Sequence, residues 1–301
     1  MKPIICVGHA ALDFVYRIEA FPETPTKVRS LEHIESGGGM AANAAAAIAR
    51  LGGPVELWSR IGADNAGARI KTILEADGVD VSCVRTYEGA RSSTSAVIVD
   101  GKGDRLIVGE RDHAMSMDAC WLPLERVAGA AAVLSDLRWL EGTLAAFEFA
   151  RAAGVPTLLD ADLGGAGALA DYLCLTDYAI FSAPALDAFA PEGDDRERLG
   201  RVLSLGVSHA GVTRGAQGYF WLSGSGKAGH QPAFASEVVD TTGAGDAFHG
   251  AFAWAVASGL AAPECARVAA AVSALKCRRL GARSGLPTLD ELKSFLAAQD
   301  P

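Results

Sequence analysis

The chain lacks the features that would place it in a membrane, outside the cell or on nucleic acid. Its longest apolar stretches, such as residues 247–257, are interrupted and fall short of the roughly 20 residues that a membrane span needs. Its six cysteines show no paired spacing, and residues 1–6 lack the apolar core and cleavage site of a signal peptide. Lys and Arg total 27 against 36 Asp and Glu, and the basic residues are scattered. We therefore expect a cytoplasmic protein with no membrane and no nucleic-acid partner.

Two common nucleotide-binding motifs are missing or misplaced. No G-x-x-x-x-G-K-[ST] string occurs, so the chain is not a P-loop enzyme. Residues 224–229 match G-x-G-x-x-G, but they lie between the strand-like runs 219–222 and 230–232, with no helix after them. This spacing predicts a hairpin loop. Any phosphate must then be bound at another place in the chain.

What the chain does have is an alternation of short apolar runs with helical patterns, in 301 residues of which 50% are apolar. This alternation predicts βαβ units around a mostly parallel sheet that is covered on both faces. The expected strands are 4–8, 55–58, 131–134, 157–160, 178–181 and 210–213, with a helix at about 66–77. Residues 12–35 and 91–110 instead alternate as strands without an intervening helix, which indicates a flap of a few antiparallel strands. We expect one domain, 1–301.

A helix start late in the chain has the chemistry of phosphoryl transfer. Amides at a helix N-terminus have no partners and carry the positive end of the helix dipole, so the turn Gly243-Ala244-Gly245 lets a phosphate approach closely. Asp246 follows this turn and is placed to accept a proton from an attacking hydroxyl, a contribution of roughly 10²–10⁴ in rate. The alternative is a carboxylate that only stabilises the helix dipole.

A second glycine run opens a helix early in the chain, at residues 37–39. Consecutive glycines permit a close approach of ligand to backbone. Asn43 has the only side chain on the first turns with both a hydrogen-bond donor and an acceptor. Its amide is suited to binding a hydroxyl, and the alternative is a packing residue at the helix start.

These two segments resemble the signatures of the ribokinase-like (phosphofructokinase B) carbohydrate kinase family. The matching strings are Gly-Gly-x-x-Ala-Asn at 38–43 and Asp-Thr-x-Gly-Ala-Gly-Asp at 240–246, and the likeness covers essentially the whole chain. Further matches lie at Gly8, Asp13, Thr213, Gly215, Gly281 and Pro287. The resemblance implies an ATP- and Mg²⁺-dependent kinase with a ribokinase-like α/β fold and a small β lid, about 12–35 and 91–110, over a sugar site.

The resemblance also implies roles for individual residues. The sugar hydroxyls would be held by Asp13, Gly38, Gly39 and Asn43, and the nucleotide by Thr213 and Gly215. Small residues on a later helix, Ala270, Ser273 and Ala274, would leave room for adenine. Asp240 and Thr242 would form a monovalent-cation site, which suggests K⁺, although both could simply cap the turn.

One family feature is missing. Many members have Asn-x-x-Glu after the strand that corresponds to 178–181, and the Glu helps to order magnesium. Residues 182–185 read Ser-Ala-Pro-Ala here. Asp160 and Asp162 are the candidate substitutes for this carboxylate. His249, one turn beyond Asp246, is expected to face the core rather than a ligand.

Within the family the chain is similar to the bacterial kinases of 6-deoxy-6-sulfofructose, in residues 92–100, 135–139, 231–234 and 274–277. This narrower resemblance would bring Lys27 of the lid and Arg138 around an anionic end of the sugar. Asp13, Arg138 and Asp160 each close a strand-like run, where open α/β sheets bind ligands. Gly109, however, stands where that branch would offer an amide.

Several alternatives stay open. The substrate could be a small ketose, another sugar, a sugar phosphate or a keto-deoxy acid. A nucleoside kinase would need an apolar pocket for a base, for which the lid offers only Phe14, Tyr16 and Phe21. A weakly catalytic sugar-binding regulator would explain the missing Glu. Apolar alternation in the lid strands further predicts a homodimer through the lid.

Overall fold

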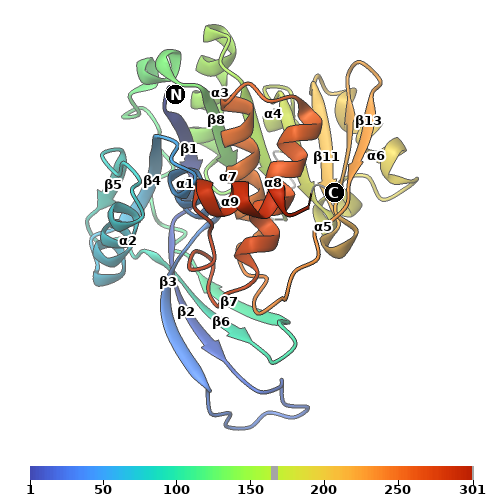
Figure 1. Cartoon of the computed structure of the whole chain (residues 1–301). Coiled ribbons are helices and arrows are strands. Elements are labelled where there is room, and N and C mark those ends of the chain that lie inside the picture. Colours follow the sequence, from blue (N-terminus) through green and yellow to red (C-terminus); the bar gives the residue numbers. More distant parts are fainter. Residues whose placement is uncertain (164–168, 300–301) are drawn as a thin grey trace.

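The computed structural model describes residues 1–163 and 169–299, so residues 164–168 and 300–301 of the expected single domain lie outside the described residues. Its largest element is a sheet in the order β13-β12-β11-β10-β9-β8-β1-β4-β5 (Figure 1). The strands are β1 (Ile4–Gly8), β4 (Val55–Gly62), β5 (Val84–Tyr87), β8 (Ala132–Asp136), β9 (Thr157–Ala161), β10 (Tyr178–Ser182), β11 (His209–Thr213), β12 (Tyr219–Ser223) and β13 (Ala228–Gln231). All pairs are parallel except β11–β12 and β12–β13. The expected mostly parallel sheet is confirmed.

Helices cover both faces of this sheet, so its strands are buried on both sides. In β1, Ile4 and Cys6 belong to one core cluster, and Ile5 and Val7 to the other. This is the period of two that places successive side chains on opposite faces. The first face packs against α1 (Met40–Arg50), α2 (Asn65–Ala76), α7 (Ala244–Ala257) and α8 (Ala262–Lys276), and α9 (Leu289–Ala297) lies outside α8. The second face packs against η1 (Leu124–Gly129), α3 (Leu140–Ala153), α4 (Leu169–Leu173), α5 (Ala183–Phe189) and α6 (Asp195–Leu203).

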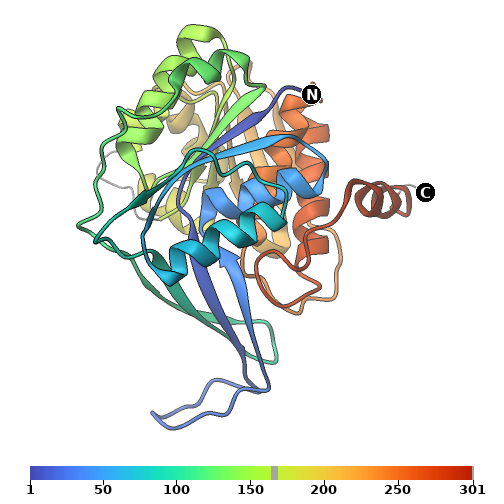
Figure 2. The same cartoon turned by 90° about the vertical axis from the view of Figure 1, so that its left-hand side faces the viewer.

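A second, smaller sheet projects from the carboxyl edge of the large one, as Figures 1 and 2 show. Its order is β3-β2-β6-β7, with β2 (Ala11–Arg17), β3 (Glu32–Gly38), β6 (Ser93–Val99) and β7 (Arg105–Glu110). We call these four strands the lid. The pairs β2–β3 and β6–β7 are antiparallel, but β2 and β6 run parallel, so the lid is a mixed sheet.

The loop at 224–229 and the place of Asp13 at the end of a strand were both expected from the sequence. Residues 224–227 connect the antiparallel strands β12 and β13, and residues 228–229 begin β13, so the hairpin is confirmed. Asp13 does not close a strand: it lies inside β2, paired with Ser36 of β3 and Ser95 of β6. The apolar run of β1 ends at Gly8 and a new strand begins at Ala11, which the sequence alone did not separate.

Across the described residues, the helices fall short of the length and apolar character that crossing a bilayer requires.

Candidate active site

The start of α7 presents backbone amides to an open position. Gly243 precedes the helix in the left-handed conformation, φ 73°, and no side chain caps these amides. A Cβ on Gly243 would lie 2.8 Å from the Ala282 Cβ, so only glycine fits this turn without a shift. The Ala244 amide donates to the Thr241 carbonyl at 3.2 Å, and the next amides, of Gly245 and Asp246, together with the helix dipole make a binding position for an anion.

Asn43 and Asp246 meet at this position. Asn43 Nδ2 donates a hydrogen bond to Asp246 Oδ2 at 2.7 Å, although 203 positions separate the two residues. Small residues on α1 and α7 make the contact possible: a Cβ on Gly250 would lie 2.4 Å from the Ala44 carbonyl oxygen. The two glycine-rich segments therefore build one site from opposite ends of the chain.

Arg283 holds the Asn43 amide of this pair in place, and the sequence analysis did not identify this residue. Its Nε donates to Asn43 Oδ1 at 2.8 Å, so the Asn43 amide nitrogen is directed at Asp246. Its other nitrogens donate to Asp77 Oδ2 at 3.0 Å and to the Gly38 carbonyl at 3.2 Å. The guanidinium is buried, 8% exposed. Its position between Gly281 and Pro287, two matches to the family, was the signal that could have found it.

Burial sets the protonation of the carboxylates in the site. Burial raises the pKa of Asp246 to about 6, against the hydrogen bond from Asn43, which lowers it. Burial likewise raises the pKa of Asp13 to about 6. Asp160 is more strongly affected: burial and then the charge of Asp246 hold its pKa well above the ordinary value. Because a pKa of about 6 still lies below neutral pH, Asp246 is mostly ionised there and able to accept a proton.

Comparison with known proteins agrees with this geometry. The model of the pfkB family carbohydrate kinases matches residues 1–289. The chain belongs to this family. The chain is 30% identical to an ATP-dependent ribose-1-phosphate kinase of Halopiger xanaduensis over 99% of both sequences, and 29% identical to a ribokinase of Bacillus subtilis over 99% of this chain and 100% of the relative.

Solved structures give the same family fold. A protein of Agrobacterium tumefaciens has a TM-score of 0.95 and 34% identity, with 100% of this chain and 99% of that one covered. The ribokinase of Arabidopsis thaliana, solved with ribose and ATP, has a TM-score of 0.86 and 26% identity, with 98% of each chain covered. The ribokinase-like fold is confirmed, and the chain is a sugar kinase.

The residues expected to hold sugar hydroxyls gather beside Asn43. A Cβ on Gly38 would lie 2.3 Å from Asp13 Oδ1, so this glycine lets the carboxylate approach the backbone. Gly39, with φ 86°, precedes α1, and a Cβ there would lie 2.5 Å from the His9 carbonyl oxygen. Asp13 and Asn43 are both buried, 6% and 4% exposed. Their roles in sugar binding stay a prediction.

Arg138 and Lys27 are not brought together by any contact in the described chain. Arg138 follows β8, and its amide donates to Asp136 Oδ1 at 2.8 Å, while Asp136 Oδ2 accepts from the Ala41 amide at the start of α1 at 3.1 Å. It therefore lies near the kinase site. Lys27 is exposed on the connection between β2 and β3, which ends far from the large sheet (Figure 2). Gly109 is exposed on β7.

The loop that precedes α7 does not fit the expected K⁺ site well. Asp240 Oδ1 accepts a hydrogen bond from the Thr242 amide at 2.8 Å, and Oδ2 accepts one from the Gly281 amide at 2.7 Å. The Asp240 carbonyl accepts one from Lys276 Nζ at 2.8 Å. The Thr242 hydroxyl is buried without a described partner. Asp240 thus has its oxygens engaged by the protein itself.

The expected nucleotide residues lie on two elements of the kinase. Thr213 ends β11, where its hydroxyl donates to the Phe181 carbonyl at 3.3 Å, and Gly215 follows with φ 54°. Ala270, Ser273 and Ala274 lie on α8, and Ser273 Oγ donates to the Ala244 carbonyl at 3.1 Å. The α8 residues are thus tied to the first turn of α7, but adenine contact stays a prediction.

Acidic side chains in the site fit a magnesium ion that is bound chiefly by phosphates. Burial and then the charges of Asp246 and Asp162 raise the pKa of Asp160, and burial and the charge of Asp162 raise that of Asp246, so a divalent cation would relieve repulsion in this group. Ser182 Oγ donates to Asp162 Oδ1 at 2.7 Å. The serine that stands where the family has the Asn of Asn-x-x-Glu therefore lies beside this carboxylate. Within residues 1–163 and 169–299, no group of three or more His, Cys, Asp or Glu side chains forms a cage by itself. Mg²⁺ typically uses one or two carboxylates plus substrate phosphates.

His249 lies in the core, as expected. It is 3% exposed, and its ring nitrogens face the carbonyls of Gly245 at 2.7 Å and Ile180 at 3.2 Å. Its Nδ1 lies 3.4 Å from Asp160 Oδ2, so it helps to fix that carboxylate behind the site. Burial lowers the pKa of this imidazole.

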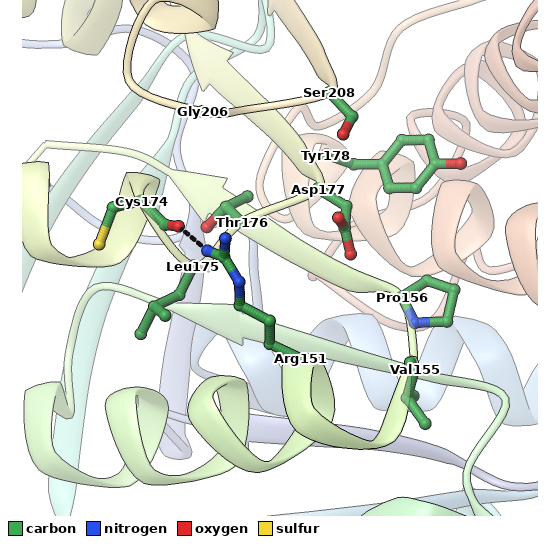
Figure 3. A pocket seen from close by; sticks show the side chains of 11 residues that line it. Arg151, Val155, Pro156, Cys174, Leu175, Thr176, Asp177, Tyr178, Gly206 and Ser208 are labelled. Atoms are coloured by element: carbon green, nitrogen blue, oxygen red, sulfur yellow. Dashed lines mark hydrogen bonds between the residues drawn. The ribbon is translucent and has the colours of Figure 1, made fainter.

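A hollow of about 460 Å³ lies at the amino ends of the strands of the large sheet, opposite to the kinase site. Figure 3 shows its lining, which comes from the segments that enter β9, β10 and β11, and Arg151 donates there to the Cys174 carbonyl. Ligands of open α/β sheets bind at the carboxyl ends of the strands. This hollow is at their amino ends and is separate from the kinase site.

Proposed function

We propose that this kinase transfers the γ-phosphoryl group of ATP to a hydroxyl of a small ketose-type sugar. The hydrogen bond between Asn43 and Asp246, at the uncapped start of α7, is the observation that carries the proposal. A hydroxyl-binding amide, a carboxylate base and an anion-binding helix start are the three parts that direct transfer to a hydroxyl requires.

Asp246 acts as the base. A sugar hydroxyl gripped by Asn43 and Asp13 lies within reach of the Asp246 carboxylate, which takes the hydroxyl proton as its oxygen attacks the γ-phosphorus. The bond to the β-phosphate oxygen breaks, and ADP leaves. The amides of Ala244, Gly245 and Asp246 stabilise the charge on the transferred group, the usual dominant contribution in this chemistry.

ATP would be held by Thr213 and Gly215 at the end of β11 and by Ala270, Ser273 and Ala274 on α8. Mg²⁺, when bound with the phosphates, neutralises their charge and orients them. Asp160 and Asp162 are the carboxylates of this chain that would hold its water shell, in place of the missing Glu. The structure of a relative from E. coli with ATP and Mg²⁺ shares this fold.

The substrate hypothesis is an anionic sugar such as 6-deoxy-6-sulfofructose, with Arg138 as the anion-binding group. An arginine fork suits sulfonate, phosphate or carboxylate. The position of Arg138 supports this hypothesis: it follows the carboxyl end of β8, and its amide shares the Asp136 carboxylate with the amides of His9 and Ala41, beside the start of α1. One relative is a ribose-1-phosphate kinase and others are ribokinases, so phosphorylated and neutral pentoses are the alternatives to test.

We further propose a cytoplasmic homodimer that forms through the lid. Every residue of the edge strand β7 is exposed, and Leu106, Ile107 and Val108 are 52%, 49% and 63% exposed. An exposed apolar edge strand is an aggregation hazard unless a partner covers it. The six cysteines are free, as a reducing cytoplasm would keep them. Light scattering of wild type and of Ile107→Lys tests the dimer: a monomeric wild type contradicts it.

The function is tested by measuring ADP release with ribose, ribose 1-phosphate, fructose, fructose 6-phosphate, 6-deoxy-6-sulfofructose and two nucleosides. Asp246→Asn should abolish turnover while retaining sugar and nucleotide binding. Asp290→Asn is the matched control, because Asp290 is an exposed carboxylate in the first turn of α9. Turnover of Asp246→Asn within tenfold of wild type would contradict the role of Asp246. Activity on nucleosides alone would identify a nucleoside kinase, and silence with every acceptor a regulator.

A further inference from the structure

Lys276 is a buried cation that the mechanism above does not use. It is the last residue of α8, and its side chain is 0% exposed. Lysine is almost never fully buried unless it is paired, because removing an ammonium from water costs several kcal/mol. Its Nζ donates to the Asp240 carbonyl at 2.8 Å. A position at a helix C-terminus is favourable for a cation but does not by itself require burial.

The ammonium lies under the loop that shapes the anion-binding turn. Asp240 is only three residues before Gly243, and its amide and that of Val239 are bonded to the Cys277 carbonyl at 3.1 and 2.8 Å. The Asp240 carboxylate, itself 0% exposed, accepts from the amides of Thr242 and Gly281. Lys276 therefore brings a positive charge to the segment that sets the direction of the α7 amides.

This placement disagrees with a site for an exchangeable cation at the same loop. A metal ion there needs oxygen ligands, but the oxygens of Asp240 already accept hydrogen bonds from protein donors. A second positive charge close to the Lys276 ammonium would also meet like-charge repulsion in a buried region. The orphaned Thr242 hydroxyl is the one described feature of the loop that favours an added ligand.

We propose that the Lys276 ammonium is the resident counter-ion of the 240–243 loop, so that phosphoryl transfer by this chain needs no added monovalent cation. Lys276 is a positioning residue: it holds the Asp240 carbonyl, and through it the turn at Gly243, without touching the substrates. Burial lowers the pKa of this ammonium, and the charge of Asp240, the next influence, opposes that change. The inference rests on the proposed kinase function.

Wild-type turnover in 100 mM KCl and in 100 mM tetramethylammonium chloride decides the proposal without any variant. The choice of about 100 mM holds screening equal in both salts, with a Debye length of about 10 Å. We expect kcat/KM values that agree within about twofold, a difference of about 0.4 kcal/mol at most. Stimulation by K⁺ of more than about fivefold overturns the proposal. Silence in both salts with every acceptor would instead contradict the kinase function itself.

Lys276→Met, which keeps the length and removes the charge, gives a second readout. We expect this variant to have a lower kcat with little change in KM. We also expect its kcat, and the melting temperature of the ligand-free protein, to be higher in KCl than in the organic salt. Lys293→Met is the matched control, because Lys293 is an exposed lysine on α9. If Lys276→Met does not fold, Lys276→Gln takes its place. A variant with wild-type kcat and no response to K⁺ overturns the proposal.

Discussion

Replacing Asn43 with Ala should shift the pH dependence of the reaction toward alkaline pH. The base acts only when its carboxylate is ionised, and Asp246 has a pKa of about 6 in the free enzyme. The hydrogen bond from Asn43, 2.7 Å long, stabilises the ionised form and so lowers this pKa. Loss of the donor must raise it.

The size of the shift follows from the strength of the lost bond. A hydrogen bond to a charged group contributes about 1.5–3 kcal/mol, and one pKa unit corresponds to about 1.4 kcal/mol. The acidic limb of kcat/KM, which reports the free enzyme, should therefore move up by about one to two units in Asn43→Ala. At pH 7 the ionised fraction then falls from about 0.9 to between about 0.5 and 0.1, so the variant loses a further roughly two- to tenfold beyond its loss of sugar binding.

The assay is initial velocity against pH from 5 to 9, with a coupled detection of ADP that is checked at each pH. Asn65→Ala is the control, since Asn65 is an exposed amide in the first turn of α2. Asp13 also has a pKa of about 6, so Asp13→Asn must retain the limb if Asp246 causes it. An unmoved limb in Asn43→Ala, with kcat/KM lowered equally at every pH, would show that Asn43 only holds the sugar.

Three further predictions concern the same site. Arg138→Ala should lower kcat/KM about ten- to a few hundredfold for an anionic sugar and leave a neutral ketose within about twofold, as one charge-assisted bond implies; equal losses would make Arg138 structural. Gly243→Ala should lower kcat about tenfold or more, because a Cβ would meet Ala282 at 2.8 Å, whereas Gly259→Ala, with φ 77° and open space around it, should not. Asp246→Asn should melt at a higher temperature than wild type above pH 6: the raised pKa of Asp246 contributes stability below its ordinary value of 3.8 that is lost as pH rises through about 6, and an Asn avoids this loss. A difference in melting temperature that does not shrink toward pH 4 would contradict that account.

Patterns of period two and of small residues made the fold and the centre of the site readable. The alternation that sends Ile4 and Ile5 to opposite faces predicted the covered sheet, and the glycine turns before Asn43 and Asp246 predicted two helix starts. The contact between Asn43 and Asp246 could be inferred only from the family resemblance, since nothing local joins them.

Other features depended on three-dimensional packing that no local pattern records. Arg283 and Lys276 look like ordinary surface cations in the sequence, and only the fold shows that both are buried among acceptors. The parallel pairing of β2 with β6 joins strands that lie far apart in the chain, so alternation alone could not distinguish it from an antiparallel flap. Lys27 carried a predicted role, but it is exposed on the connection between β2 and β3, and no contact in the described chain joins it to Arg138.

The division of the site between the two ends of the chain has an evolutionary consequence. Groups proposed to hold the sugar come from β2, the end of β3, the start of α1 and Arg138 after β8, whereas those proposed to handle phosphate come from β11, α7 and α8. Substitutions in the first 140 residues can therefore change which acceptor is recognised while the machinery for the donor is inherited unaltered. Chimeras that exchange this segment between relatives should exchange acceptor preference with it, provided that position 43 keeps its amide toward Asp246.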